Sequence, residues 1–324
     1  MNSAEIGKMI TERMVAALED GTVPWRRGWS VQCGGLPRSM ATGALYRGVN
    51  VFTLGLETMT AKYGSPWWGT FDRIAELSGM VRTPRPGGRG WYWKSPDGAR
   101  RGVRKGEHAT RVVHWKTIVK PDPDHPDDPE RQRRFLTGRT DRVFNASQAG
   151  HLPDRFFPDR DPASALAPLP EPDAVLKGYL ARGGPEVVHA FQGRAFYRAD
   201  TDTITLPERG QFASPEEYAA TCAHEWVHST GHPARLDREG IRSFDHFGSD
   251  RYSREELAAE MGAAMFCEMT GVRGTFDNSA AYIASWLAVL RNDVTLIPRA
   301  ATEAQAAIDL IFGTGHAAAP TSGK

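Results

Sequence analysis

Apolar side chains recur with helical spacing in several stretches of the chain. In the first of them, Ile6, Met9 and Ile10 share one side of a predicted helix. A later helix is bounded by residues that favour helix ends, with Ser214 as its N-cap, Pro215 in its first turn and Gly231 just past its end. The pattern predicts helices over residues 6–18, 72–77, 215–230, 253–267, 278–290 and 298–312.

Shorter stretches have the alternation and the flanking turn residues of β-strands. Residues 90–94 lie between Pro-Gly and Pro-Asp-Gly, which is typical of a hairpin strand, and residues 110–119 predict a longer strand. Three short strands follow at 187–191, 194–198 and 203–206, the first two joined by Gln-Gly. Helices and strands together predict an α+β protein.

The length of 324 residues favours two domains, and a stretch rich in proline, alanine and aspartate over residues 158–172 marks the boundary. We expect a basic, tryptophan-rich domain over residues 1–150, a Pro-rich linker over 151–172 and a second domain over 173–315. Residues 316–324 are predicted to be a disordered tail. The charged, Pro-rich residues 122–130 predict a solvated loop.

Residues 224–228 read His-Glu-Trp-Val-His inside a predicted helix. Residues four apart on a helix have Cβ atoms roughly 5–6 Å apart, so His224 and His228 can bind one metal ion. Glu225 is then the candidate catalytic general base. A chance match to so short a motif is the alternative interpretation.

A catalytic zinc site needs a third protein ligand and an open position. Glu256 and Glu260 share one face of the helix over 253–267, with Glu255 rotated from it by about 100°. Ser253 and Glu256 predict a capping box, so Glu256 either caps the helix or orients a ligand. Glu260 lies in an apolar run where a carboxylate needs a partner, and it is the preferred third ligand.

His232 is an alternative third ligand. The pattern that recruits a third histidine, however, places it six residues after the second one, which is Ala234 here. The expected cofactor is one divalent ion, zinc first, with manganese or cobalt as alternatives for the same ligands.

Charge is distributed unevenly along the chain. Residues 21–120 contain 17 lysines and arginines against 5 acidic residues, whereas residues 151–324 contain 16 against 24. Seven of the nine tryptophans also precede residue 120. Basic groups neutralise phosphates and aromatic rings stack on unpaired bases, so the first domain is predicted to bind single-stranded DNA. The candidate contacts are Trp91, Trp93, Arg89, Lys94, Arg100, Arg101, Arg104 and Lys105.

The tryptophans have a second interpretation, because most tryptophan side chains in proteins are buried in a core. Three cysteines far apart in the sequence suggest no disulfide framework and favour a reducing compartment. Neither a signal peptide nor a membrane-spanning stretch is apparent, so a cytoplasmic protein without a membrane partner is expected.

Across nearly its whole length the chain resembles the ArdC-type antirestriction proteins, which are also similar to the N-terminal part of plasmid TraC primases. The stretches that match are GTVPW (21–25), YRGVN (46–50), PWWGTF (66–71), VRKGE (103–107), VFN (143–145), HEWVHSTGHP (224–233), REELAAE (254–260) and AYIASWL (281–287). Residues 82–101 and 122–130 look longer than the family pattern.

This resemblance implies a mixed α/β domain that binds single-stranded DNA, followed by a zincin-like metallopeptidase domain. It implies protection of incoming plasmid DNA from host restriction enzymes during conjugation, with His224, His228 and Glu260 as metal ligands and Glu225 as the catalytic glutamate. In one hypothesis the metal domain is a hydrolase with a host protein as its substrate. In the other the metal site is structural or vestigial, and the protein protects DNA by coating it.

Overall fold

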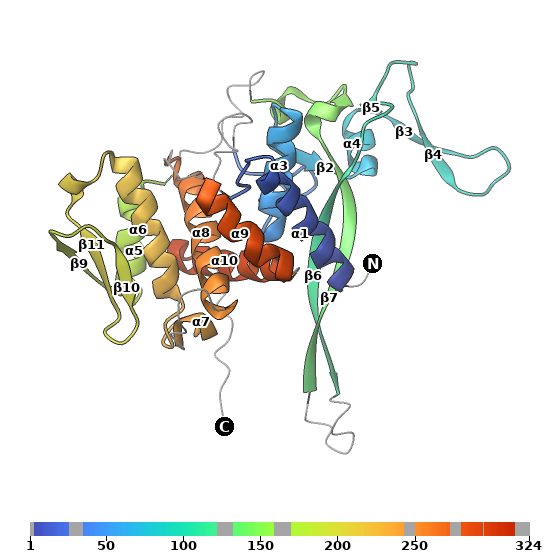
Figure 1. The fold of residues 1–324 in the computed structure, drawn as a ribbon. Coiled ribbons are helices and arrows are strands. Elements are labelled where there is room, and N and C mark those ends of the chain that lie inside the picture. Colours follow the sequence, from blue (N-terminus) through green and yellow to red (C-terminus); the bar gives the residue numbers. More distant parts are fainter. Residues whose placement is uncertain are drawn as a thin grey trace. The chain divides into compact units, whose positions relative to one another are not determined.

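The computed structural model describes residues 3–25, 35–121, 132–158, 170–242, 250–272, 280–293 and 295–314, with only the backbone for 3–4, 115–121, 132–137, 250–252 and 280–281. The chain divides into two units (Figure 1). The first comprises Met1–Glu12, Trp29–Tyr46 and Asn50–Ala165, and the second comprises Arg13–Gly28, Arg47–Val49 and Leu166–Lys324. Two short early segments therefore belong with the C-terminal half.

The first unit is built on a four-stranded sheet with the order β1-β2-β7-β6. Its long hairpin is formed by antiparallel β6 and β7, and β2 pairs with the end of β7. The elements are α1 (Ser3–Glu19, which spans both units), β1 (Arg38–Ser39), α3 (Val49–Ala61, which begins in the second unit), β2 (Trp67–Gly69), α4 (Phe71–Leu77), β6 (Thr110–Pro121), β7 (Gln132–Asn145), and the 3-10 helices η1 (Ala146–Gln148) and η2 (Asp154–Phe156).

Two smaller strand pairs complete the first unit. Antiparallel β3 (Val81–Pro84) and β4 (Trp91–Lys94) form the hairpin predicted at residues 90–94. In the other pair, β5 (Gly102–Val103) is antiparallel to β8 (Ala149–Gly150).

Buried side chains from helices and strands form the core of the first unit. Trp68 is fully buried with Leu54, Val112 and Val143, and a second cluster centres on Ile74. Trp25 is also fully buried, in the second unit. Burial therefore accounts for part of the early tryptophan content, while Trp29 and the side chain of Trp115 lie outside the described part of the chain.

The second unit packs helices beside a three-stranded sheet with the order β10-β11-β9. Its elements are α5 (Pro172–Ala181), β9 (Glu186–Ala190), β10 (Phe196–Arg198), β11 (Thr203–Pro207), η4 (Arg209–Gln211), α6 (Pro215–Thr230), α7 (Glu239–Arg242), α8 (Asp250–Thr270), α9 (Ala280–Asn292) and α10 (Leu296–Phe312). The three strands were predicted, but β9 and β10 do not pair with each other. Central β11 separates them, parallel to β9 and antiparallel to β10.

A close contact between α6 and α8 organises the second unit. A Cβ atom at Gly262 would lie 2.7 Å from Val227, so only glycine allows the two helices to approach this closely. Helix α10 packs on both α6 and α8, and Arg254 of α8 forms an ion pair with Glu303 of α10 at 3.1 Å. The α6–α8 contact brings the two histidines of α6 close to Glu256 of α8.

The two early segments contact C-terminal helices of the second unit. The rings of Trp25 and Trp286 meet edge to face with centroids 6.0 Å apart. Arg47 forms an ion pair with Asp309, and the backbone N–H of Gly48 donates to Gln305 at 2.9 Å. The second unit therefore depends on residues close to the N-terminus.

Several predictions fall outside the described residues: the loop over 122–130, most of the boundary stretch over 158–172, and the tail over 316–324. None of the described helices is both long and apolar enough to cross a bilayer.

Candidate metal centre

Helix α6 carries both histidines on one face, and its ends confirm the sequence prediction. The hydroxyl of Ser214 caps the first turn by accepting from the N–H of Glu217 at 3.1 Å, Pro215 is the first helical residue, and Gly231 is the C-cap. One turn separates His224 from His228, and their Nε2 atoms are 3.0 Å apart. The two nitrogens thus point at a common space.

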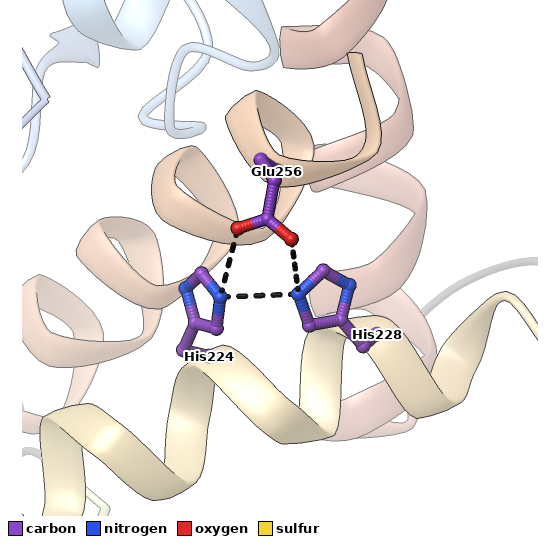
Figure 2. A group of neighbouring side chains, drawn as sticks. All are labelled: His224, His228 and Glu256. Atoms are coloured by element: carbon purple, nitrogen blue, oxygen red, sulfur yellow. Dashed lines mark hydrogen bonds and ion pairs between the residues drawn. The ribbon is translucent and has the colours of Figure 1, made fainter. Parts of the chain in front are cut away.

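Helix α8 supplies a carboxylate to the same space (Figure 2). The oxygens of Glu256 lie 3.6 Å from Nε2 of His224 and 3.6 Å from Nε2 of His228. Ligand atoms at about 2.0–2.1 Å from a tetrahedral zinc ion are about 3.3 Å apart, which is close to these separations. Two imidazoles and one carboxylate are also a donor set that suits zinc or manganese. The residues therefore fit a divalent ion.

The sequence interpretation preferred Glu260 as third ligand, but the structure groups Glu256 with the histidines. The preference depended on a capping box between Ser253 and Glu256. Helix α8 already begins at Asp250, so Ser253 lies inside the helix and the predicted capping box is wrong. Glu256 is consequently available to the site, while Glu260 lies one turn further along the same helix.

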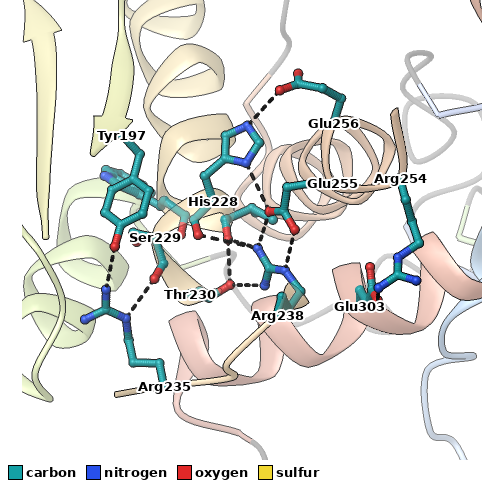
Figure 3. A network of polar contacts seen from close by, with 12 residues as sticks. Tyr197, His228, Ser229, Thr230, Arg235, Arg238, Arg254, Glu255, Glu256 and Glu303 are labelled. Atoms are coloured by element: carbon teal, nitrogen blue, oxygen red, sulfur yellow. Dashed lines mark hydrogen bonds and ion pairs between the residues drawn. The ribbon is translucent and has the colours of Figure 1, made fainter. Parts of the chain in front are cut away.

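Glu255 contacts His228 on the side away from Glu256, and Arg238 in turn contacts Glu255, as Figure 3 shows. Nδ1 of His228 lies 3.1 Å from a carboxylate oxygen of Glu255. Arg238 donates to both oxygens of Glu255, at 2.9 and 2.6 Å, and also to the carbonyl of Val227 at 2.7 Å. A carboxylate on Nδ1 keeps the proton there and leaves the lone pair of Nε2 for a metal.

Sequence reasoning did not assign this role to Glu255 or Arg238. Glu255 was set aside because it is rotated away from the face of Glu256, yet this rotation directs it to the other nitrogen of His228. No motif indicated Arg238, which reaches Glu255 from the turn that precedes α7.

The electrostatic environment favours a cation at the histidines. Burial alone would lower the pKa of His224, but the hydrogen bond to Glu256 and the negative charges of Glu260, Glu225 and Glu256 raise it to about 9. Burial would raise the pKa of Glu256, but the hydrogen bond with His224 and the charges of both histidines lower it. The same negative charges would attract a divalent ion.

Glu255 stays ionised although it is buried. Burial would raise its pKa, but hydrogen bonds from Arg238 and His228 outweigh this effect and lower the pKa to about 2. A permanently charged carboxylate behind His228 makes the imidazole a better metal ligand.

Glu225 and His232 have different positions relative to the cluster. Glu225 is buried on α6, and its charge acts on His224. His232 lies beyond the C-cap of α6, where Nδ1 accepts from the N–H of Ala234 at 3.2 Å. Within the described residues, His232 is not part of the metal-ligand group.

The candidate DNA contacts all belong to the first unit. Trp91 on β4 is 54% exposed, and the guanidinium of Arg82 lies 5.6 Å from its ring centroid. Trp93 is less exposed, and its indole N–H donates to Asp72 at 2.7 Å. Lys94 ends β4, and Arg89 lies in the turn before it. Of the two rings predicted to stack on bases, Trp91 is therefore the better candidate.

The remaining basic candidates flank β5. Arg101 is bound to Asp97 at 2.5 Å, and Arg104 to Glu107 at 2.6 Å. Arg100 and Lys105 are exposed. These four residues form one basic stretch over residues 100–105.

Comparisons with known proteins agree with the two units. A family model described as the N-terminal domain of anti-restriction factor ArdC matches residues 4–144, and one described as a zincin-like metallopeptidase matches residues 175–303. The antirestriction protein ArdC from plasmid R388 has a similar structure, solved metal-free and with Mn(II). These structures are 34% and 35% identical to this chain, each with a TM-score of 0.68, and the match covers 95% of this chain and 97% of that one.

Three further relatives match in sequence. The chain is 32% identical over 314 residues to a DNA primase TraC from Escherichia coli, and 31% identical to a second one. It spans only 27% and 20% of the lengths of these primases. It is also 31% identical to the uncharacterized protein y4eC of Sinorhizobium fredii strain NBRC 101917 / NGR234, covering 91% of that protein.

The second unit thus has the fold of a zincin-like metallopeptidase domain, joined to an N-terminal domain of the ArdC type. The chain belongs to the ArdC family of antirestriction proteins.

Proposed function

We propose that the protein binds one divalent metal ion through His224, His228 and Glu256. The observation that carries this proposal is the convergence of three ligand atoms within 4.8 Å, from two helices, around His-Glu-x-x-His. Glu256 replaces Glu260, which was preferred as third ligand in the sequence analysis. A manganese-bound structure of R388 ArdC supports a divalent ion, and zinc and manganese are both candidates.

The residues around the ligands fit hydrolysis of a peptide bond in a protein substrate. A divalent ion at this position would act as a Lewis acid toward a carbonyl and acidify water. Glu225, beside His224 on α6, would be the base that takes a proton from the attacking water. Glu255 and Arg238 hold His228 with Nε2 facing the ligand group.

We further propose that the first unit binds single-stranded DNA and that the protein protects incoming DNA from restriction in the cytoplasm. The support is the excess of basic residues over 21–120, the exposed Trp91 hairpin and the family relationship to an antirestriction protein. Unpaired bases can stack on such a ring, while lysines and arginines bind phosphates.

A single substitution separates hydrolysis from protection by coating. Glu225→Gln keeps the metal ligands and removes the base, so it should retain metal and lose protection of unmodified DNA entering a restricting host. Glu216→Gln, exposed on the same helix, is the matched control and should protect like the unaltered protein. Full protection by a metal-loaded Glu225→Gln protein would instead indicate that DNA coating is sufficient.

A further inference from the structure

The first unit contains a pocket of about 510 Å³ beside the β5–β8 strand pair. Its lining includes Arg100 and Arg104, which flank β5, and Gly150 and His151 at the end of β8. A volume of this size is typical of pockets that hold a small molecule or one unit of a polymer.

Two guanidinium groups give this pocket a positive character, and no carboxylate is among the described residues that line it. Arg104 is fixed, because it donates to Glu107 at 2.6 Å and to the carbonyl of Ser147 at 2.6 Å. Within the described residues, Arg100 makes no hydrogen bond or ion pair, although its neighbour Arg101 is bound to Asp97 and to the carbonyl of Ser78. One fixed and one available guanidinium suit an anionic ligand such as a phosphate.

The backbone at the pocket wall is held in an unusual conformation. His151 has a φ of +59°, in the left-handed region that favours glycine. At the preceding residue, a Cβ atom on Gly150 would lie 2.6 Å from the carbonyl oxygen of Arg100, so the two chain segments are in close contact. Such backbone conformations at non-glycine residues concentrate at binding sites.

Apolar side chains line another part of the pocket. Leu152 is buried in the core cluster around Ile74, and Phe157 is half-buried against the same cluster. A phosphate alone would not use this apolar surface. A nucleotide would, because its base has an apolar face that stacks on aromatic rings while its phosphate takes the cations.

We propose that this pocket holds one unpaired nucleotide of a DNA strand, with its phosphate on Arg100 and Arg104 and its base against Phe157 and Leu152. The proposal rests on the proposed binding of single-stranded DNA and gives that binding a defined site. The proposal extends the candidate DNA contacts from Arg100 and Arg104 to the neighbouring His151 and Phe157. It requires an unpaired base, because a base within a duplex cannot enter a pocket.

Fluorescence anisotropy of a labelled oligothymidylate with the full-length protein tests this site. Arg100→Gln removes an exposed charge that has no described partner, and it should weaken binding about tenfold, the effect of losing one charge-assisted hydrogen bond. The slope of the logarithm of affinity against that of salt concentration should fall by roughly 0.7. His151→Gly suits the left-handed backbone, so it should keep the fold and weaken binding too.

Arg139→Gln is the matched control, because Arg139 is an exposed arginine of the same unit outside the pocket lining, and its binding should be unchanged. Oligothymidylate binding by both pocket variants at the unaltered affinity would overturn the proposal. If the unaltered protein fails to bind oligothymidylate, the proposed function itself fails.

Thymidine monophosphate distinguishes a strand from a free nucleotide. We expect it to compete only weakly, because it lacks the neighbouring nucleotides of a strand. Tight binding of the monophosphate that depends on Arg100, combined with oligothymidylate binding that does not, would overturn the assignment to a DNA strand and assign the pocket to a free nucleotide.

Discussion

The carboxylate of Glu255 lies 3.1 Å from Nδ1 of His228, on the side of the imidazole opposite to Glu256. Adjacent glutamates of α8 therefore reach the two nitrogens of one histidine. Arg238 holds Glu255 in place through two hydrogen bonds and is itself buried. Removing the charge of Glu255 should consequently change the affinity for metal while all three proposed ligands remain unaltered.

Glu255→Gln keeps the size of the side chain and removes its negative charge. Metal affinity should fall roughly 10–100-fold, because a neutral amide no longer increases the basicity of His228. Calorimetric titration with Mn²⁺ measures this loss, and Glu216→Gln is the control from an exposed position of α6. An unchanged affinity would show that Glu255 serves only the fold.

Arg238→Ala tests the same contact through stability. It leaves the buried Glu255 without its cation, and loss of one partner of a buried ion pair costs about 3–5 kcal/mol. Urea unfolding should show this decrease in the free energy of unfolding. A matched exposed variant, Arg209→Ala, removes a surface pair with Asp173 and should cost less than about 1 kcal/mol.

The choice of third ligand can be decided by metal content. Glu256→Ala should lose most of the bound metal, because its oxygens are 3.6 Å from both Nε2 atoms. Glu260→Ala should retain metal at reduced affinity, since Glu260 contributes negative charge near His224. Elemental analysis of both dialysed proteins compares them directly, and the opposite order would restore Glu260 as the ligand.

The hairpin tryptophans should behave differently in DNA binding. Trp91→Ala should cost about 1–3 kcal/mol of affinity for oligothymidylate with little change in melting temperature, because the exposed ring is free to stack. Trp93→Ala removes the hydrogen bond to Asp72 and should lower the melting temperature instead. If Trp91→Ala leaves the anisotropy titration unchanged, the hairpin does not contact the bases.

The described thiols should resist modification. Burial raises the pKa values of Cys222 and Cys267 to about 12, so little reactive thiolate forms near pH 8. In a Cys33→Ser protein, Ellman's reagent should titrate no thiol in the native state and two after denaturation. Rapid reaction of the native protein would contradict the burial of these two thiols.

The sequence predicted those features that are encoded locally. Ser214, Pro215 and Gly231 mark both ends of α6, and the turn residues around β4 mark the hairpin. The third ligand depended on where α8 begins and on how its face meets α6, which helical periodicity does not specify. The partners of β9 and Arg238 are likewise set by tertiary packing, because a strand pattern does not identify its neighbour.

The early segment that contains Trp25 has a consequence for biosynthesis. Trp25 donates its indole N–H to Tyr282, 257 residues later in the chain. At about 5–20 residues per second, a ribosome needs roughly 10–50 s to make the intervening polypeptide. The segment around Trp25 therefore lacks this partner until Tyr282 has been synthesised, and the metal-binding unit cannot complete its packing before then.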